Sequence, residues 1–402
     1  MQLGWIDFSK TERSKILSLL DLLSQDATLD ELGIAPIRDG FSNIFFPGTS
    51  TIQTRAKYFF LVPYALKELE LSKETNPYKI LRKLDEIERE CGEKLLSANP
   101  SENGIIGKRS LQNNKWVKRS PADIYWAGLR RYKIFKEENL SLSEYVAASC
   151  IQKTQKSNTL KLGNRYDTNE DKETDDKYAD DIFKISFWNM PLYNDRWKNR
   201  IQMSLTKEEG AFLEKQITES CPDTMISYIL NDNMTEIFDC KSFSDLENLI
   251  DRFPQHIQNE YYLAMDFSEF IYVARTLYNI IISDGENEEA NNEFEKQKES
   301  FLRTANIDID AIFSMLHIYK PDLKSFVKKL QDCMLNNDIE EMRRAIISRE
   351  IMLKGESRSK TAHPGEFVEW MGGRRLDYRF NNAKAILSDI FRSKEENYAE
   401  SK

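Results

Sequence analysis

Helix-start signals recur along this sequence, and they constrain its fold more than any other feature. They are Ser9 with Glu12, Asn76 with Pro77, Ser120 with Asp123, Ser141 with Glu144, Thr206 with Glu209 and Ser242 with Asp245. In most of these pairs a hydroxyl stands three residues before an acid, the pattern of a capping box. Apolar residues recur at spacings of three and four, and few stretches alternate as strands do. The sequence therefore predicts a mainly α-helical protein, with one helix from Asn76 to Gly92 and a final helix over 381–391.

The segment 46–60 concentrates polar side chains where a helix is predicted to begin. After the turn at Pro47 and Gly48 come four hydroxyls, an amide and a cation: Thr49, Ser50, Thr51, Gln53, Thr54 and Arg55. The first amides of a helix attract anions, so we expect these residues to hold a DNA phosphate. The turn loosely resembles the hairpin of helix-hairpin-helix DNA-binding proteins. The alternative is a cap followed by a solvated helix face, and Pro63 predicts a kink or break near Leu61 in the same helix.

A basic segment in an acidic chain indicates the leading partner. Residues 108–136 contain nine lysines and arginines and one acid, so this segment carries +8 in a protein of −9. Aromatic residues lie between the cations, as is typical of surfaces that hold a nucleic-acid backbone and stack its bases. The expected DNA contacts are Lys108, Arg109, Lys118, Arg119, Arg130 and Arg131, with Tyr125 and Trp126 forming a base pocket. The alternative is that the cations solvate a helix face while the rings fill the core.

Three aspartates have unusual neighbours and are the candidate catalytic residues. Asp39 follows an arginine shortly before the Pro-Gly turn, Asp377 lies among arginines, and Asp7 lies between two apolar residues. Arg375 and Arg379, on either side of Asp377, are expected to clamp a phosphate. A carboxylate beside arginine more often forms a structural salt bridge, and that alternative stays open for each aspartate.

Cysteine and histidine usage gives no support for a metal centre. The five cysteines lie far apart without a C-x-x-C motif, and there are only three histidines. These counts favour reduced thiols and neither a metal nor a cofactor, and they make a carboxylate the expected acid or base. No apolar run approaches the roughly 20 residues that span a bilayer, and the first residues lack a basic and then apolar leader. We expect a cytoplasmic protein that does not contact a membrane.

Shifts in composition suggest four parts along the chain. They are an N-terminal DNA-binding and catalytic part over 1–166, an acidic loop over 167–181, a helical domain over 182–354, and a loop with a C-terminal helix over 355–402. The last part is expected to fold back on the first. A second acidic segment, 284–299, is predicted to be a solvent-exposed loop. Within the last part, residues 355–373 are predicted to form a mobile loop.

Four segments together resemble a bacterial family catalogued only as a domain of unknown function. They are Gly4–Ser9, Leu32–Pro63, Arg119–Leu129 and Arg375–Arg379, and the likeness covers nearly the whole chain. Members of that family are similar to components of phage-defence loci, and one of them resembles the glycosylase that strips modified bases from viral DNA. The resemblance brings no catalytic residue that can be placed in this sequence.

The resemblance implies an anti-phage DNA glycosylase that excises a modified base, for example glucosylated hydroxymethylcytosine, and leaves an abasic site. Such an enzyme turns a nucleotide out of the stack, holds the flanking phosphates and uses a carboxylate while the base leaves. The rival from another class is a non-enzymatic DNA-binding or adaptor subunit that works with other proteins of a defence locus. A nuclease is less favoured, because no carboxylates and histidines stand at metal-ligand spacing.

Overall fold

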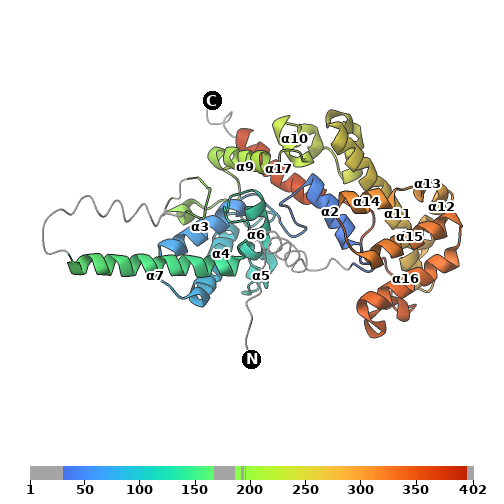
Figure 1. Cartoon of the computed structure of the whole chain (residues 1–402), viewed down its shortest axis with the longest axis horizontal. Helices are drawn as coiled ribbons and strands as arrows, with labels where there is room; N and C mark the ends of the chain where they lie inside the picture. Colours follow the sequence, from blue (N-terminus) through green and yellow to red (C-terminus); the bar gives the residue numbers. More distant parts are fainter. Residues whose placement is uncertain (1–29, 167–185, 192–193, 195, 396–402) are drawn as a thin grey trace. The chain divides into compact units, whose positions relative to one another are not determined.

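The computed structural model describes residues 30–166, 186–191, 194 and 196–395. Three sequence predictions lie outside these residues: the candidate Asp7, the helix start at Ser9, and the acidic loop over 167–181. The described residues form helices and no sheet, with one isolated antiparallel bridge between Phe135 and Trp188 (Figure 1). The prediction of a mainly α-helical protein is therefore confirmed.

The described chain divides into two compact units, and each contains segments that are distant in the sequence. Unit 1 comprises residues 47–233 and 382–395, and unit 2 comprises residues 30–46 and 234–381. This division differs from the predicted one. The boundary falls after residue 233 and not at the acidic loop, and most of the last helix belongs with the N-terminal segments of unit 1.

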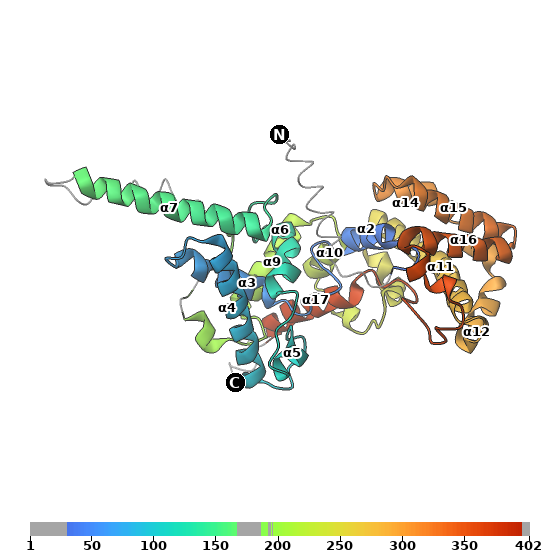
Figure 2. The same ribbon diagram turned by 90° about the horizontal axis from the view of Figure 1, so that it is seen from below.

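Unit 1 is built around one apolar helix. Its helices are α3 (Tyr58–Leu71), α4 (Pro77–Ala98), α5 (Lys108–Gln112), α6 (Pro121–Arg131), α7 (Leu142–Tyr166), α9 (Lys207–Ser220), α10 (Met225–Asn231) and most of α17 (Phe380–Glu395), with a 3₁₀ turn at Trp197–Arg200. All residues of α3 from Tyr58 to Pro63 are buried, and so are Ala65, Leu66 and Leu69, because α4, α6 and α7 all pack against this helix (Figure 2). A helix segment that is apolar on all sides, as the first half of α3 is, is expected at the centre of a core.

The capping signals of unit 1 mark helix starts correctly, but one predicted stop is wrong. Ser120 and Asp123 form the capping box of α6, and the Asn76 side chain accepts hydrogen bonds from the first amides of α4. The prediction that this helix stops at Gly92 fails, because α4 continues to Ala98. A Cβ atom at Gly92 would lie 2.9 Å from the side chain of Leu111. The glycine therefore permits close packing inside the helix and does not end it.

Unit 2 is organised around α11 (Gln255–Ile282), most of whose second half is buried. The other helices are α2 (Ala35–Phe45), α12 (Glu288–Lys298), α13 (Phe301–Thr304), α14 (Ile309–Met315), α15 (Pro321–Leu335) and α16 (Ile339–Lys354), with 3₁₀ segments at Thr235–Phe238, Phe243–Arg252, Glu356–Arg358 and Lys360–Ala362. The prediction of an acidic loop over 284–299 is wrong for most of its length. Asn287 caps α12, and Ala290 and Phe294, one helical turn apart, are buried.

The segment 355–373 is anchored to unit 2 rather than detached as the mobile loop predicted from its composition. Asn279 of α11 accepts from the Met371 amide at 2.6 Å and donates to the Met371 carbonyl at 3.2 Å. The Thr361 amide donates to the buried Glu350 carboxylate at 2.9 Å. These bonds satisfy backbone groups that a detached loop would leave to water. No helix among the described residues combines the length and the apolar character that crossing a membrane requires.

Candidate functional site

The polar segment after the Pro-Gly turn is a loop and not the start of a helix. Helix α3 begins only at Tyr58 and continues without interruption to Leu71, with Pro63 inside it. The helix start predicted in the polar segment is therefore wrong, and so is a break near Leu61, whereas a kink there stays a prediction. The amides of Thr54 and Arg55 donate to the Tyr125 hydroxyl at 2.9 and 3.1 Å. These backbone donors already have a partner within the protein.

Most side chains of this loop face inward. Thr49, Ser50 and Gln53 are buried, and Thr51 is exposed. The Gln53 amide donates to the Gly48 carbonyl at 3.1 Å. The loop lies so close to α6 that a Cβ atom at residue 128, a glycine, would be 2.5 Å from the same carbonyl oxygen. The polar segment therefore packs against α6. Thr54 also fastens it to the loop before α5, by donating to the Gly104 carbonyl at 2.6 Å.

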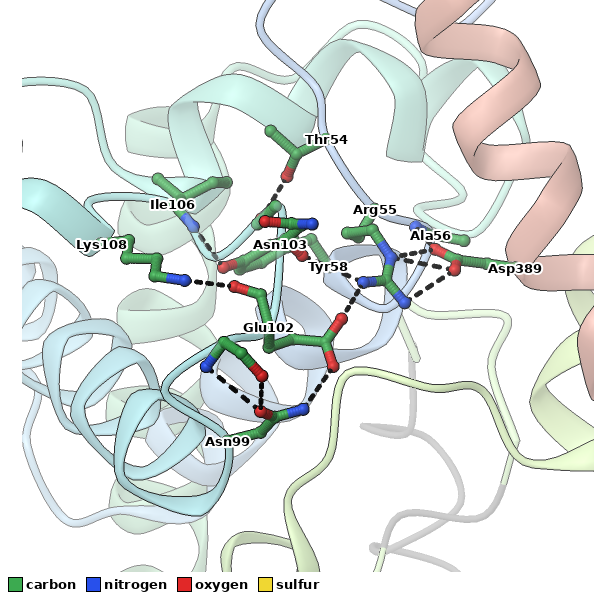
Figure 3. A network of polar contacts seen from close by, with 12 residues as sticks. Thr54, Arg55, Ala56, Tyr58, Asn99, Glu102, Asn103, Ile106, Lys108 and Asp389 are labelled. Carbon is green, nitrogen blue, oxygen red and sulfur yellow. Dashed lines mark hydrogen bonds and ion pairs between the residues drawn. The ribbon is translucent and has the colours of Figure 1, made fainter.

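Arg55 is the centre of a charged network that joins three segments of unit 1 (Figure 3). Its Nε and Nη2 atoms each lie 2.9 Å from the carboxylate of Asp389, on α17. Its Nη1 atom donates to Glu102 and, at 3.0 Å, to the Asn103 carbonyl. The Asp389 carboxylate also accepts from the Ala56 amide at 2.8 Å. Bidentate pairing of this kind fixes both the distance and the orientation of the partners.

Burial controls the electrostatics of this network. The Asp389 side chain is 3% exposed, and burial raises the pKa of its carboxyl group while the bonds from Arg55 and Ala56 oppose that rise. Burial also acts to lower the pKa of Arg55, but hydrogen bonds and charges from Asp389 and Glu102 outweigh it, so the pKa is raised overall. The arginine therefore stays charged and is the main partner of both carboxylates.

A cavity of about 390 Å³ opens beside this network. Its lining residues come from the loop before α3, the end of α4 and the loop after it, the segment before α9, and α17: Arg55, Leu95, Ala98, Asn99, Glu102, Ile201, Gln202, Met203, Ser204, Leu205, Asp389, Arg392 and Ser393. Lys108, the first residue of α5, donates to the Glu102 carbonyl at 2.8 Å. The first residue of the basic segment thus contacts the loop that carries one wall of the cavity.

The basic segment separates into interior aromatic residues and exposed cations. Tyr125 and Trp126, the predicted base pocket, are buried, and the Trp126 indole donates to the Leu140 carbonyl at 3.0 Å. Arg130 is buried and donates to the Glu138 carbonyl at 3.0 Å. Both rings are therefore part of the core and lie off the surface on which bases were predicted to stack.

Six cations of the segment are exposed: Arg109, Lys115, Lys118, Arg131, Lys133 and Lys136. None of them forms an ion pair with a residue that the structure describes. Three precede α6 and three lie at or beyond its last residue. The cations therefore form two groups in the sequence, one before α6 and one at or after the end of this helix, whose 11 residues span about 16 Å. Arg119, between them in sequence, is half-buried.

The predicted catalytic aspartates of unit 2 have structural partners. Asp39 is buried, with its Oδ1 atom 3.1 Å from Arg38 and 3.2 Å from Arg379. Arg379, 3% exposed at its side chain, also donates to Asn43 at 2.9 Å. Asp377 accepts from the Asn381 amide at 3.1 Å, at the start of α17.

Arg375, the other predicted phosphate clamp, has a carboxylate partner as well. Its Nε and Nη2 atoms donate to Glu269 at 2.5 and 3.0 Å, and its guanidinium lies 4.2 Å from the centre of the Tyr272 ring. The structure thus brings Asp39 together with Arg379, whereas Arg375 pairs with α11.

Sequence reasoning missed Asp389, Glu102 and the cavity. The sequence signal for Asp389 was an isolated carboxylate in the apolar part of the last helix. Ile386 and Ile390, near it in that helix, are buried. Glu102 lies in a polar loop and carried no such signal. Gln202 and Ser204 are ordinary surface types, and only the fold brings them to the cavity.

These observations define a mainly helical protein of two units, with a polar cavity in unit 1 and surface cations that have no ion-pair partner among the described residues. Among the described residues, no group of histidine, cysteine, aspartate and glutamate side chains could hold a metal ion. The chain belongs to a family of unknown function, DUF6361, which it matches over residues 1–245. No curated protein and no solved structure gives a significant match.

Proposed function

We propose that the protein binds DNA through the exposed cations of residues 108–136 and removes a modified base from it. The observation that carries the DNA-binding proposal is the pairing pattern of surface charges. On α4 of the same unit, Arg89 pairs with Glu93 at 2.9 Å and Lys94 with Glu90 at 2.8 Å. The six exposed cations of the basic segment have no such partner among the described residues. Unpaired cations in an acidic protein are available for phosphates.

Base removal is proposed as a hydrolysis. Water gives its hydroxyl group to C1′ of the sugar, the C1′–N bond breaks with its electron pair moving to the base, and the base takes up the remaining proton. A buried carboxylate can stabilise the sugar cation and accept the proton of the attacking water. Asp389 suits this role better than Asp39 or Asp377, because it lies in the same unit as the unpaired cations and lines a cavity.

The biological setting that we propose is the bacterial cytoplasm, in defence against phage whose DNA carries modified bases. The support is the resemblance of four sequence segments to a family with members in defence loci. A plaque assay on modified and unmodified phage tests it: protection is expected against the modified phage alone, and equal plaque counts with and without the protein would contradict it.

A non-enzymatic DNA-binding subunit is the second candidate, and one observation favours it. Asp389 accepts two bonds from Arg55 and one from Ala56, so its oxygens are largely occupied. For this second candidate, the role of the carboxylate is to fasten α17 to the loop. In that case the protein would bind DNA and recruit other proteins of a defence locus to it.

Base release from modified DNA separates the two candidates. Purified protein is incubated in EDTA with unmodified and hypermodified phage DNA, and abasic sites are then converted to breaks with alkali. We expect breaks in modified DNA only. The Asp223→Asn variant should still produce them, whereas Asp389→Asn should bind DNA without producing them. Asp223 is an exposed residue of the same unit and serves as the matched control. Intact DNA of both kinds, with binding preserved, would favour the adaptor.

A further inference from the structure

The cavity of unit 1 has two chemically different kinds of wall. Apolar side chains come from Leu95, Ala98, Ile201, Met203 and Leu205. Amides and hydroxyls come from Asn99, Gln202, Ser204 and Ser393. The volume of about 390 Å³ lies within the usual range for a small-molecule site. This combination suits a flat ring that offers hydrogen-bonding groups along its edge.

The charged side chains of the cavity balance each other. Arg55 and Arg392 carry two positive charges, and Glu102 and Asp389 carry two negative ones. Arg55 is committed to both carboxylates, and Arg392 lies near enough to Asp389 to act on its pKa. A charged ligand would therefore enter a site with no surplus of opposite charge. An uncharged ligand avoids that desolvation penalty.

Two polar side chains of the lining are uncommitted. Gln202 and Ser204 make no side-chain hydrogen bond to any residue within the described ranges, whereas Asn99 donates to Glu102 at 3.1 Å. A glutamine amide offers a donor and an acceptor side by side, the arrangement that pairs with the edge of a nucleobase. The apolar residues on the other walls can cover the faces of such a ring.

We propose that this cavity binds an uncharged nucleobase, alone or as its nucleoside. The inference rests on the proposed function, because base removal would deliver such a ring to unit 1. The cavity would then hold the displaced base between apolar walls while Gln202 and Ser204 bond to its edge.

Titration of the full-length protein with free bases and nucleosides tests the cavity directly. Cytosine, 5-hydroxymethylcytosine, adenine and their nucleosides are the probes, followed by ligand-observed NMR and calorimetry. We expect millimolar or tighter binding that weakens at least tenfold in Ala98→Phe and Gln202→Ala. Ser97→Phe places the same ring on the neighbouring exposed position of α4, which does not line the cavity, and should bind as the unaltered protein does.

Three outcomes would overturn the proposal: no binding of any probe up to its solubility, equal binding in Ala98→Phe, or a clear preference for nucleoside monophosphates over nucleosides. The last would indicate an anion site at Arg392. DNA affinity measured in parallel distinguishes the two hypotheses. If the protein binds DNA but no base, only the proposal for the cavity is contradicted. If it binds a base but no DNA, only the proposed function is contradicted.

Discussion

At Glu88 of α4, unit 1 buries a carboxyl group against the first turn of α6. Its Oε1 atom accepts from the Ala122 amide at 2.7 Å, and its other oxygen has no hydrogen-bond partner within the described structure. Burial raises the pKa of Glu88 to about 8 from an ordinary value of 4.5, and the charges of Asp123 and Asp85 act in the same direction. The folded protein therefore binds this proton more tightly than the unfolded chain does.

The consequence is a stability that falls with rising pH. Between pH 4.5 and about 8 the unfolded chain releases the Glu88 proton while the folded protein keeps it, so the free energy of unfolding declines across this window and levels off above it. Each unit of pKa difference corresponds to about 1.4 kcal/mol. Glu88→Gln should remove most of this decline in urea unfolding at pH 6 and pH 9. Glu86→Gln, an exposed residue of the same helix, should keep it, and a parallel decline in both variants would refute the assignment.

The pair of Arg55 and Asp389 allows a second residue-scale prediction. Removing one partner of a buried ion pair leaves the other charge unpaired, at a cost of about 3 kcal/mol or more. We expect Arg55→Met and Asp389→Leu each to destabilise the protein by about that amount, and the double variant to lose clearly less than the sum of the two. A double-mutant cycle in urea measures this coupling. Additive losses would show that the two side chains do not depend on each other.

The same pair shows how far residues could be predicted from the sequence. Arg55 was selected because it stands in a polar cluster, but a cluster in sequence does not reveal which way each side chain points. Its partner lies more than 300 positions away on α17, and no local pattern connects them. Asp39 is a catalytic candidate in the sequence because it stands shortly before the Pro-Gly turn, but the structure holds it in a buried ion pair with Arg38 and Arg379.

Among the elements, α6 carries the clearest prediction about DNA contact. One group of exposed cations precedes this helix in the sequence and the other lies at or beyond its last residue, so we expect the two groups to contact different phosphates. Changing Lys115 and Lys118 to glutamate tests the first group, and changing Arg131 and Lys133 to glutamate tests the second. Each pair should weaken DNA binding and reduce the salt slope by about 2 if both members contact phosphate.

The control is Lys296→Glu with Lys298→Glu on α12, where both cations already pair with carboxylates. It should leave the salt slope unchanged. If reversing the charge of one group does not weaken DNA binding, DNA contacts only the other group. If neither group matters, the exposed cations are not the DNA site.

Local signals predicted element starts better than element ends. Capping boxes bring together residues three positions apart, so Ser120 and Thr206 mark true helix starts. Glycine is ambiguous, because it serves helix ends and close packing equally, and at Gly92 packing decides. The charge run of α12 concealed two buried residues, Ala290 and Phe294, that attach this helix to unit 2. Two buried positions among many charged ones are too weak a pattern to be recognised in a short stretch of sequence.

For the whole molecule, the sequence predicted the helical class but not the division into units. Both units are assembled from discontinuous segments, and the last helix belongs mostly with the N-terminal part of unit 1. Composition shifts can mark a boundary only along the sequence, so they cannot detect a unit that is formed by two separate stretches of the chain. The cavity in unit 1 depends on this arrangement, because its walls come from α4, the segment before α9, and α17.

Charge distribution over the whole chain leads to the last prediction, on the salt dependence of DNA binding. A protein of −9 is repelled by DNA on average, so we expect the proposed affinity to come from the +8 segment. With at most six exposed cations contacting phosphates, a plot of log affinity against log salt should be linear with a slope no steeper than about −5. Fluorescence anisotropy from 25 to about 300 mM salt on duplex DNA of scrambled sequence measures it. A slope near zero would mean that phosphates are not the contact, and a much steeper one would require cations outside residues 108–136.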